Sequence, residues 1–209
     1  MHTHNSLQWR YATKQFDVSK ELPADDLVYI LEAGRLTATS FGLQPLKIVV
    51  VTDKAKKQAL MEKAYGQEHV GTNSALLVLA ARTDIDEIFI AEYTARIEAA
   101  RNLPTGTADG YKDTMVGSLT KKSDADRLIW AQKQCYIVLG TMMIAAAERQ
   151  VDGCPMEGFD PAGFNEILGL DTHHLHATVI FPIGYRAATD QTQHYAKVRI
   201  ASEDFVVTI

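Results

Sequence analysis

The sequence predicts a sandwich of helices packed on a β-sheet, of the α/β or α+β class. Helix-like and strand-like segments alternate along the chain, which is the pattern of a sheet covered by helices. With 209 residues, 46% of them hydrophobic and 22% charged, the chain has the size and composition of a globular domain with a sizeable core. Because no repeat and no clean linker divides it, we expect one domain over 1–209.

Helices are predicted where apolar positions recur with the helical period between recognisable start and stop signals. Pro23 opens one helix, Asp53 and Ser123 cap two others, and Gly169 ends a fourth. A Gly- and Pro-containing stretch, 103–111, is expected to be a flexible connection. The expected helices cover 6–11, a segment from Pro23 to Gly34, 54–65, 87–102, 125–150 and 161–168.

Strands are predicted at four short apolar runs, 47–51, 76–80, 151–154 and 176–183. The run over 76–80 is apolar throughout, as in a strand covered on both faces. The last residues, 205–209, are also β-prone but have no strand nearby in sequence to pair with.

The longest predicted helix, 125–150, is apolar almost all round from Cys135 onward. Such a helix is buried on all sides, either in a core or between two subunits. Cys135 and Cys154 are in no metal or redox pattern, so both are expected to be buried, reduced thiols.

The overall charge excludes some classes of partner. The formal net charge is −5 and the isoelectric point is about 5.8, so nothing draws the chain to nucleic acid or to an anionic membrane. No signal peptide is visible, and the longest apolar run is shorter than the roughly 20 residues that span a bilayer. A cytoplasmic protein is therefore expected.

Two pairs of cations near opposite ends of the chain indicate an anion site. Arg10 and Lys14 stand near the start, and Lys197 and Arg199 near the end. On a helix Arg10 and Lys14 would share a face, and on an extended segment Lys197 and Arg199 would share a side. A solvated basic surface is the alternative, but Arg and Lys at these spacings suit a phosphate. With the turn at 155–158, whose Gly158 permits close backbone approach, they suggest a phosphorylated cofactor.

The chain resembles the FMN-dependent nitroreductase family, and the resemblance covers nearly all of the sequence. No single motif is specific, but five occur in the family's order. They are the R-x-S-x-K-x-F-D-like start at 9–17, the N-x-Q-P-W-like segment 43–47, the central strand 75–81, the E-G-F turn at 156–160 and the basic pair at 197–199.

The resemblance implies a three-layer α+β sandwich, with a central, mainly antiparallel sheet flanked by helices. It also implies a homodimer in which C-terminal tails are exchanged between subunits and the sites lie at the interface. A buried long helix and a tail without a local partner are what such a dimer needs.

By resemblance, Arg10, Lys197 and Arg199 hold the phosphate and ribityl end of FMN. Lys14 reaches the pyrimidine edge, and Tyr11 and Ala12 belong to the same cofactor-binding segment. Ala12 stands where the family often has Ser, so one hydrogen bond of roughly 1 kcal/mol is lost.

Two further residues, Gln67 and His69, lie in a turn-like stretch. They are either exposed loop residues or, by resemblance, contacts to the pyrimidine ring and ribityl chain. Gln67 has the donors and the acceptor to match a uracil-like edge.

The 155–158 turn is either a plain surface turn or, by resemblance, the flavin's neighbour. In the second reading the backbone of Pro155 and Met156 lines one face of the ring. The N–H near Gly158 donates to flavin N5, and the Glu157 side chain organises water or nicotinamide. No side-chain acid or base is then essential, because the flavin is the catalytic group.

Phe41, Gly42, Leu46 and Tyr111 are expected on the substrate side. The family often has Asn at the position of Gly42 and Trp at that of Leu46, which puts the acceptor preference in doubt, not the cofactor. Phe41 is either core or a residue that stacks over substrate.

The expected function is reduction of nitroaromatic and quinone-type acceptors by NADH or NADPH, in a two-step cycle on FMN. The alternatives are a flavin-binding sensor or carrier without reductase activity, or another flavin chemistry such as dehalogenation, dehydrogenation or flavin breakdown. His173, His174 and His176 precede a strand without a metal-ligand spacing, so no metal is expected. Motifs of hydrolases, Rossmann proteins and P-loop NTPases are absent from the sequence.

Overall fold

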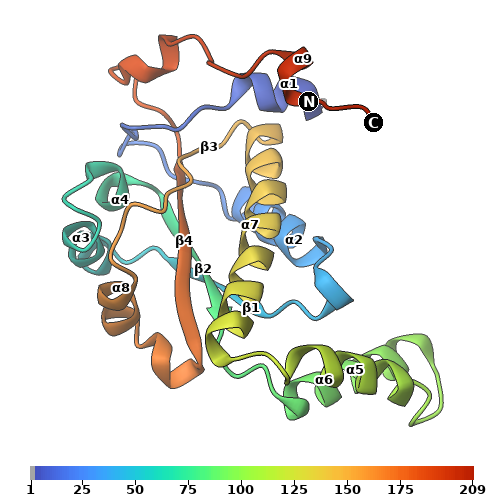
Figure 1. The fold of residues 1–209 in the computed structure, drawn as a ribbon. Coiled ribbons are helices and arrows are strands. Elements are labelled where there is room, and N and C mark those ends of the chain that lie inside the picture. Colours follow the sequence, from blue (N-terminus) through green and yellow to red (C-terminus); the bar gives the residue numbers. More distant parts are fainter. Residues whose placement is uncertain (1–2) are drawn as a thin grey trace.

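The computed structural model describes residues 3–209 and is built around one antiparallel sheet (Figure 1). Its strands lie in the order β1-β2-β4-β3, and every neighbouring pair is antiparallel. The bounds are β1 (Leu46–Val51), β2 (Ala75–Arg82), β3 (Asp152–Gly153) and β4 (Leu175–Gly184). All four strands were predicted, with limits that differ by a few residues.

Helices cover both faces of this sheet, which gives the three-layer α+β sandwich (Figure 1). On one face Ile30, Met142 and their neighbours pack on alternate strand residues such as Leu77 and Leu79. On the other face Leu60 and Phe164 pack on the residues between them, because successive strand side chains point to opposite faces. The helices are α1 (Thr3–Trp9), α2 (Ala24–Leu36), α3 (Lys54–Glu62), α4 (Glu68–Thr72), α5 (Glu87–Arg101), α6 (Asp109–Leu119), α7 (Asp124–Glu148), α8 (Pro161–Leu168) and α9 (Ser202–Phe205).

Strand β1 leaves one edge of the sheet without a partner among the described residues. The N–H of Arg82 donates to the carbonyl of Pro45, and hydrogen-bonded pairs alternate along an antiparallel ladder. The backbone groups of Leu46, Ile48 and Val50 therefore point away from β2. A free edge of this kind is a template for another strand.

Local signals set several helix ends as predicted. Asp53 accepts a hydrogen bond from the N–H of Lys56, and Ser123 accepts one from the N–H of Asp126. Gly169 ends α8 in the left-handed conformation, with φ 64°. These caps satisfy backbone groups that a helix end leaves unpaired.

Helix α7 is not buried on all sides within one chain. Its inner face, with Ala131, Cys135 and Met142, is fully buried, whereas Ile129 and Ile137 on the outer face are 50% and 49% exposed. The first alternative, a helix buried in the core of one chain, is therefore wrong. The second, a helix buried between two subunits, stays a prediction.

Three local expectations were wrong, wholly or in part. The first helix ends at Trp9, so Arg10 and Lys14 lie on an extended segment rather than on one helical face. The stretch with Gln67 and His69 leads into the short helix α4, and the last three residues of the expected loop 103–111 belong to α6. The tail holds the short helix α9, and residues 206–209 pair with no strand of the described chain, in agreement with the lack of a local partner.

Candidate functional site

The fold brings the three cofactor-related segments together at one end of the sheet. Ala12 forms a parallel bridge with Gly153, and the N–H of Thr13 donates to the carbonyl of Gly153 at 3.4 Å. The Lys14 ammonium lies 3.5 Å from the Cys154 sulfur. The first segment therefore runs beside the chain that enters the 155–158 turn.

Asp190 holds these segments together through hydrogen bonds, and the sequence analysis did not predict this residue. Its side chain is only 1% exposed. One oxygen accepts hydrogen bonds from the Tyr11 hydroxyl (2.9 Å) and from the backbone N–H groups of Lys14 (2.8 Å) and Gln15 (3.3 Å). The other oxygen accepts from the N–H and the hydroxyl of Thr192, at 3.0 and 2.6 Å.

Those hydrogen bonds keep Asp190 ionised. Burial by itself raises the pKa of this carboxyl, but the hydrogen bonds from Thr192, Lys14 and Tyr11 outweigh burial and lower the pKa to about 2. The spacing Asp-x-Thr is the signature of a side chain that caps the backbone two residues on, and it is the only local signal that marks Asp190.

The cations gather beside this anchor. Burial lowers the pKa of Arg10; the nearby Cys154 opposes this in part, and a smaller effect of Arg199 lowers the pKa further. Burial also lowers the pKa of Lys197, together with the positive charges of Arg10, Arg199 and Arg186. Within residues 3–209, Arg10, Lys14, Lys197 and Arg199 make no ion pair with a carboxylate. Like charges held together without a counter-charge are typical of an anion-binding site.

Arg186 belongs to the same end of the molecule but is already paired. It forms an ion pair with the buried Asp152 at 2.6 Å, and its guanidinium stacks over the rings of Trp9 (4.4 Å) and Tyr11 (4.6 Å). Arg186 thus fixes the end of α1 against the sheet and orients the chain that carries Arg10.

His69 is buried and lies near Lys14, so the alternative of an exposed loop residue is wrong for it. It is 5% exposed, and its Nε2 atom has no hydrogen-bond partner among the described residues. Burial and the positive charge of Lys14 lower its pKa to about 4, against the opposing effect of Asp190. A neutral imidazole with one free nitrogen therefore stands beside the anion site.

Gln67 holds the 155–158 turn. Its side-chain amide donates to the carbonyls of Gly158 at 2.7 Å and Ala64 at 3.0 Å. Met156 makes a two-way backbone bridge with Ile180, at 2.9 and 3.0 Å. Glu157 is exposed, and burial together with its carboxylate raises the pKa of Tyr136 to about 12.

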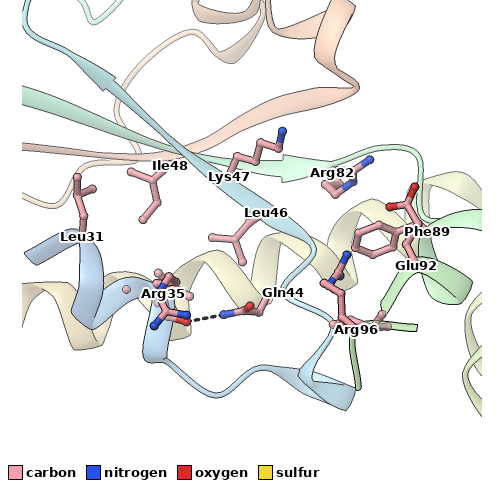
Figure 2. Close-up of a pocket in the computed structure, with 13 residues that line it drawn as sticks. Leu31, Arg35, Gln44, Leu46, Lys47, Ile48, Arg82, Phe89, Glu92 and Arg96 are labelled. Carbon is pink, nitrogen blue, oxygen red and sulfur yellow. Dashed lines mark hydrogen bonds between the residues drawn. The ribbon is translucent and has the colours of Figure 1, made fainter. Parts of the chain in front are cut away.

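The residues expected on the substrate side form a separate group. The Tyr111 hydroxyl donates to the carbonyl of Phe41 at 2.9 Å, and the Phe41 ring contacts those of Tyr111 and Trp130 at centroid distances of 6.3 and 6.5 Å. Leu46 is elsewhere again, at the edge of the sheet, where it lines a cavity with Leu31, Ile48 and Phe89 (Figure 2).

Helix α7 keeps the two groups apart. Trp130 is near its N-terminal end beside α6, whereas α1 and α9 lie at its C-terminal end (Figure 1). At 1.5 Å per residue, Trp130 is about 25 Å along the axis from Ala147. Within one chain, the aromatic group therefore lies at the opposite end of α7 from α1, the helix that precedes Arg10.

The structure is an α+β protein with a cluster of cations at one end of its sheet. Residues 7–185 match the Nitroreductase family, so the chain belongs to that family. Among its relatives, the Bacillus subtilis protein named "Putative NAD(P)H nitroreductase YfkO" is 35% identical over 97% of this chain and 95% of its own length. The similarly named Staphylococcus haemolyticus protein SH0546 is 32% identical over 97% and 94%.

Solved structures share the fold at lower identity. The Bacillus subtilis protein ydfN superposes with a TM-score of 0.88 at 22% identity, over 99% of this chain and 98% of its own. An Exiguobacterium sibiricum protein solved in complex with FMN gives 0.85 at 18% identity, over 100% and 98%. The enone reductase CLA-ER gives 0.80 at 16% identity, over 99% and 97%.

None of the helices within 3–209 is long and apolar enough to cross a membrane. In the same part of the chain no three His, Cys, Asp or Glu side chains are grouped as metal ligands would be. Cys135 and Cys154 are buried and unpaired, as expected.

Proposed function

We propose that this protein is an FMN-dependent oxidoreductase that uses NADH or NADPH to reduce nitroaromatic and quinone-type acceptors. The observation that carries the proposal is the group of four cations that have no carboxylate partners at the end of the sheet. A chain with a net charge of −5 concentrates Arg10, Lys14, Lys197 and Arg199 at one place. A bound anion would relieve the repulsion within such a cluster, and a phosphate monoester suits it.

The residues present fit FMN at two further points. The free Nε2 atom of the buried His69 needs a polar partner, which the ribityl chain or pyrimidine edge supplies. The turn at Gly158 is open on its outer side, since a Cβ there would meet only Gln67, at 3.5 Å. Backbone can thus come close to a planar ring at this turn.

In this proposal Arg10, Lys197 and Arg199 bind the phosphate and ribityl end, and Lys14 and His69 face the pyrimidine edge. When bound, FMN supplies the hydride chemistry. Lys14 places a positive charge where negative charge grows on reduction. Because Ala12 has no side-chain hydroxyl to donate, binding of the phosphate depends on the cations and on backbone groups.

The 155–158 turn is proposed to contact the flavin ring. Gln67 holds the carbonyl of Gly158, which leaves the backbone N–H of the turn free to donate toward the ring. The backbone of Pro155 and Met156 lines one face. Glu157, exposed beside the Tyr136 hydroxyl, organises water or nicotinamide at the edge of the site.

We further propose that the single 209-residue domain works as a homodimer. In one chain Trp130, which the Phe41 ring contacts, lies about 25 Å along α7 from Ala147 at the other end of the helix, so a second copy has to bring its own Phe41, Gly42 and Tyr111 to complete the site. The open face of α7, with Ile129 and Ile137, is an apolar surface for this contact.

The tail provides the second contact. Phe205 and Val207 are 75% and 83% exposed in one chain, and Glu203 and Asp204 precede them. The free edge of β1 borders a cavity of about 440 Å³ with an apolar floor and a cationic rim (Figure 2). The charged lining residues are Arg35, Lys47, Arg82, Arg96 and one carboxylate, Glu92; Arg35 and Arg82 are each paired with a nearby carboxylate, so Lys47 and Arg96 supply most of the open positive charge. An acidic, apolar tail from a second copy matches this groove in charge and can add a strand to β1.

The purified protein tests the proposal directly. It should be yellow, and acid should release a chromophore that co-migrates with FMN; FAD, or no flavin after incubation with FMN, would refute the cofactor assignment. NADH or NADPH should bleach the flavin without air.

Steady-state turnover with menadione and nitrofurazone then separates a reductase from a flavin carrier. An enone belongs in the acceptor panel, because one protein of this fold is an enone reductase. Turnover of the enone alone would favour a different flavin chemistry on this scaffold.

A further inference from the structure

We infer that Tyr93 is a positioning residue that sets acceptor selectivity by fixing Phe41 through Gly42. The inference rests on the proposed function, in which Phe41 contacts the acceptor. It starts from the loop between α2 and β1, which contains three residues in the left-handed region. They are Phe41 (φ 58°), Gly42 (φ 73°) and Gln44 (φ 49°).

A left-handed phenylalanine persists only where its surroundings hold it. The N–H of Ser40 donates to the side chain of Gln134 on α7 at 2.9 Å. The carbonyl of Phe41 accepts from Tyr111 on α6, also at 2.9 Å. Contacts from two helices therefore fix the backbone on either side of the Phe41 side chain.

Tyr93, on α5, closes the remaining side. A Cβ atom on Gly42 would lie 2.2 Å from the Tyr93 hydroxyl oxygen and 3.3 Å from the carbon that bears it. The Tyr93 ring is itself packed under the guanidinium of Arg96 at 5.7 Å. Gly42 is thus required twice, for its positive φ and for the space that the Tyr93 hydroxyl occupies.

In this chain the Tyr93 hydroxyl therefore packs against bare backbone at position 42. Any shift of Tyr93 or of the loop moves the Phe41 ring against Tyr111 and Trp130, and so changes the shape of the aromatic wall offered to an acceptor. Large and small acceptors should respond differently to such a change.

Gly42→Ala, Tyr93→Phe and the double variant test the contact in the FMN-loaded protein. Gly42→Ala should change the ratio of kcat/KM for menadione to that for nitrofurazone by about tenfold, the scale that a methylene-sized misfit produces in an apolar pocket. Adding Tyr93→Phe removes the clashing oxygen and should restore the ratio to within about threefold of the original. The strain of a left-handed alanine is present in both Gly42→Ala and the double variant. The change in the ratio between these two variants therefore measures the contact with the Tyr93 hydroxyl alone.

Gly117→Ala is the matched control, because a Cβ there meets nothing within 4 Å. Flavin content should be the same in all variants, because in the proposed site the cations hold the cofactor and the loop contacts only the acceptor. A ratio that Gly42→Ala leaves unchanged, or that Tyr93→Phe fails to restore, would overturn the inference.

Tyr93→Leu covers the case in which Gly42→Ala fails to fold. It adds no atom to the loop but removes the ring from Gly42, so it should also change the ratio, and an unchanged ratio would again overturn the inference. If the unaltered protein reduces no acceptor, the proposed function fails and the selectivity role fails with it. Unfolding midpoints of the double-variant cycle then still report whether the Gly42–Tyr93 contact exists.

Discussion

Asp190→Asn is the substitution that most directly tests how the candidate site is held together. Asp190 accepts five hydrogen bonds, three from 11–15 and two from Thr192. An amide in its place can accept at only one end. In either orientation its NH₂ group faces at least one backbone N–H, of Lys14 or of Thr192.

The cost can be worked from these contacts. One buried donor left unpaired costs about 1–3 kcal/mol, and the remaining bonds lose the roughly 1 kcal/mol by which a charged acceptor exceeds a neutral one. We expect Asp190→Asn to lower the free energy of unfolding by about 3 kcal/mol. With a urea m-value of about 2 kcal/mol/M, the midpoint should fall by about 1.5 M.

The assay is urea unfolding of the flavin-free protein at pH 7 and fixed protein concentration, since a dimer's midpoint depends on concentration. Asp171→Asn, which changes an exposed carboxylate, is the matched control. The same experiment at low pH tests whether the stabilisation by Asp190 is lost when its carboxylate is protonated. The pKa of Asp190 is about 2 in the folded chain, against an ordinary value of 3.8.

The stabilisation is therefore fully present above pH 3.8 and is lost as the pH falls toward 2. The difference between the original protein and Asp190→Asn should shrink over the same window. Equal midpoints for Asp190→Asn and Asp171→Asn at pH 7 would show that the carboxylate does not hold the two segments.

The remaining predictions concern the cofactor, His69 and the tail. Arg199→Ala should weaken FMN binding by about 1.5–3 kcal/mol, or about tenfold to a hundredfold, whereas Lys54→Ala on an exposed helix face should not; equal affinities would contradict the phosphate clamp. His69, with a pKa of about 4 in the folded chain against the ordinary 6.5, binds a proton more readily when unfolded, so it should reduce stability as the pH falls from 6.5 to 4. His69→Gln should flatten the pH dependence of the unfolding free energy in that window, and identical slopes would argue that His69 is solvated. Deleting 203–209 should reduce both dimer stability and bound FMN, as measured by light scattering and flavin absorbance; a stable monomer with full flavin would refute the shared site.

Local chemistry made much of the secondary structure predictable. The strands were found because apolar, β-branched runs such as 47–51 and 76–80 mark buried strands wherever they lie. The helix ends at Asp53, Ser123 and Gly169 were found because a cap satisfies backbone groups within a few residues of itself.

Weak local signals account for the errors. Helix α4 has five residues, too few for a period to show, and α6 begins directly after a stretch rich in Gly and Pro. At the N-terminus, Arg10 and Lys14 have helical spacing but lie beyond the helix, because pairing with Gly153 and Asp190 extends the chain. Tertiary contacts there override local preference.

The sequence alone, through its order of motifs, pointed to the family and named the residues that we propose for the cofactor. It could not indicate that Asp190 joins two of those segments, since its partners Tyr11 and Lys14 are 179 and 176 residues away. Nor could it show that Tyr93 fills the space beside Gly42, or that α7 separates Phe41 from the cations. Such facts depend on which distant surfaces meet, and that is decided by how the helices and the sheet pack together, not by any pattern within a few residues.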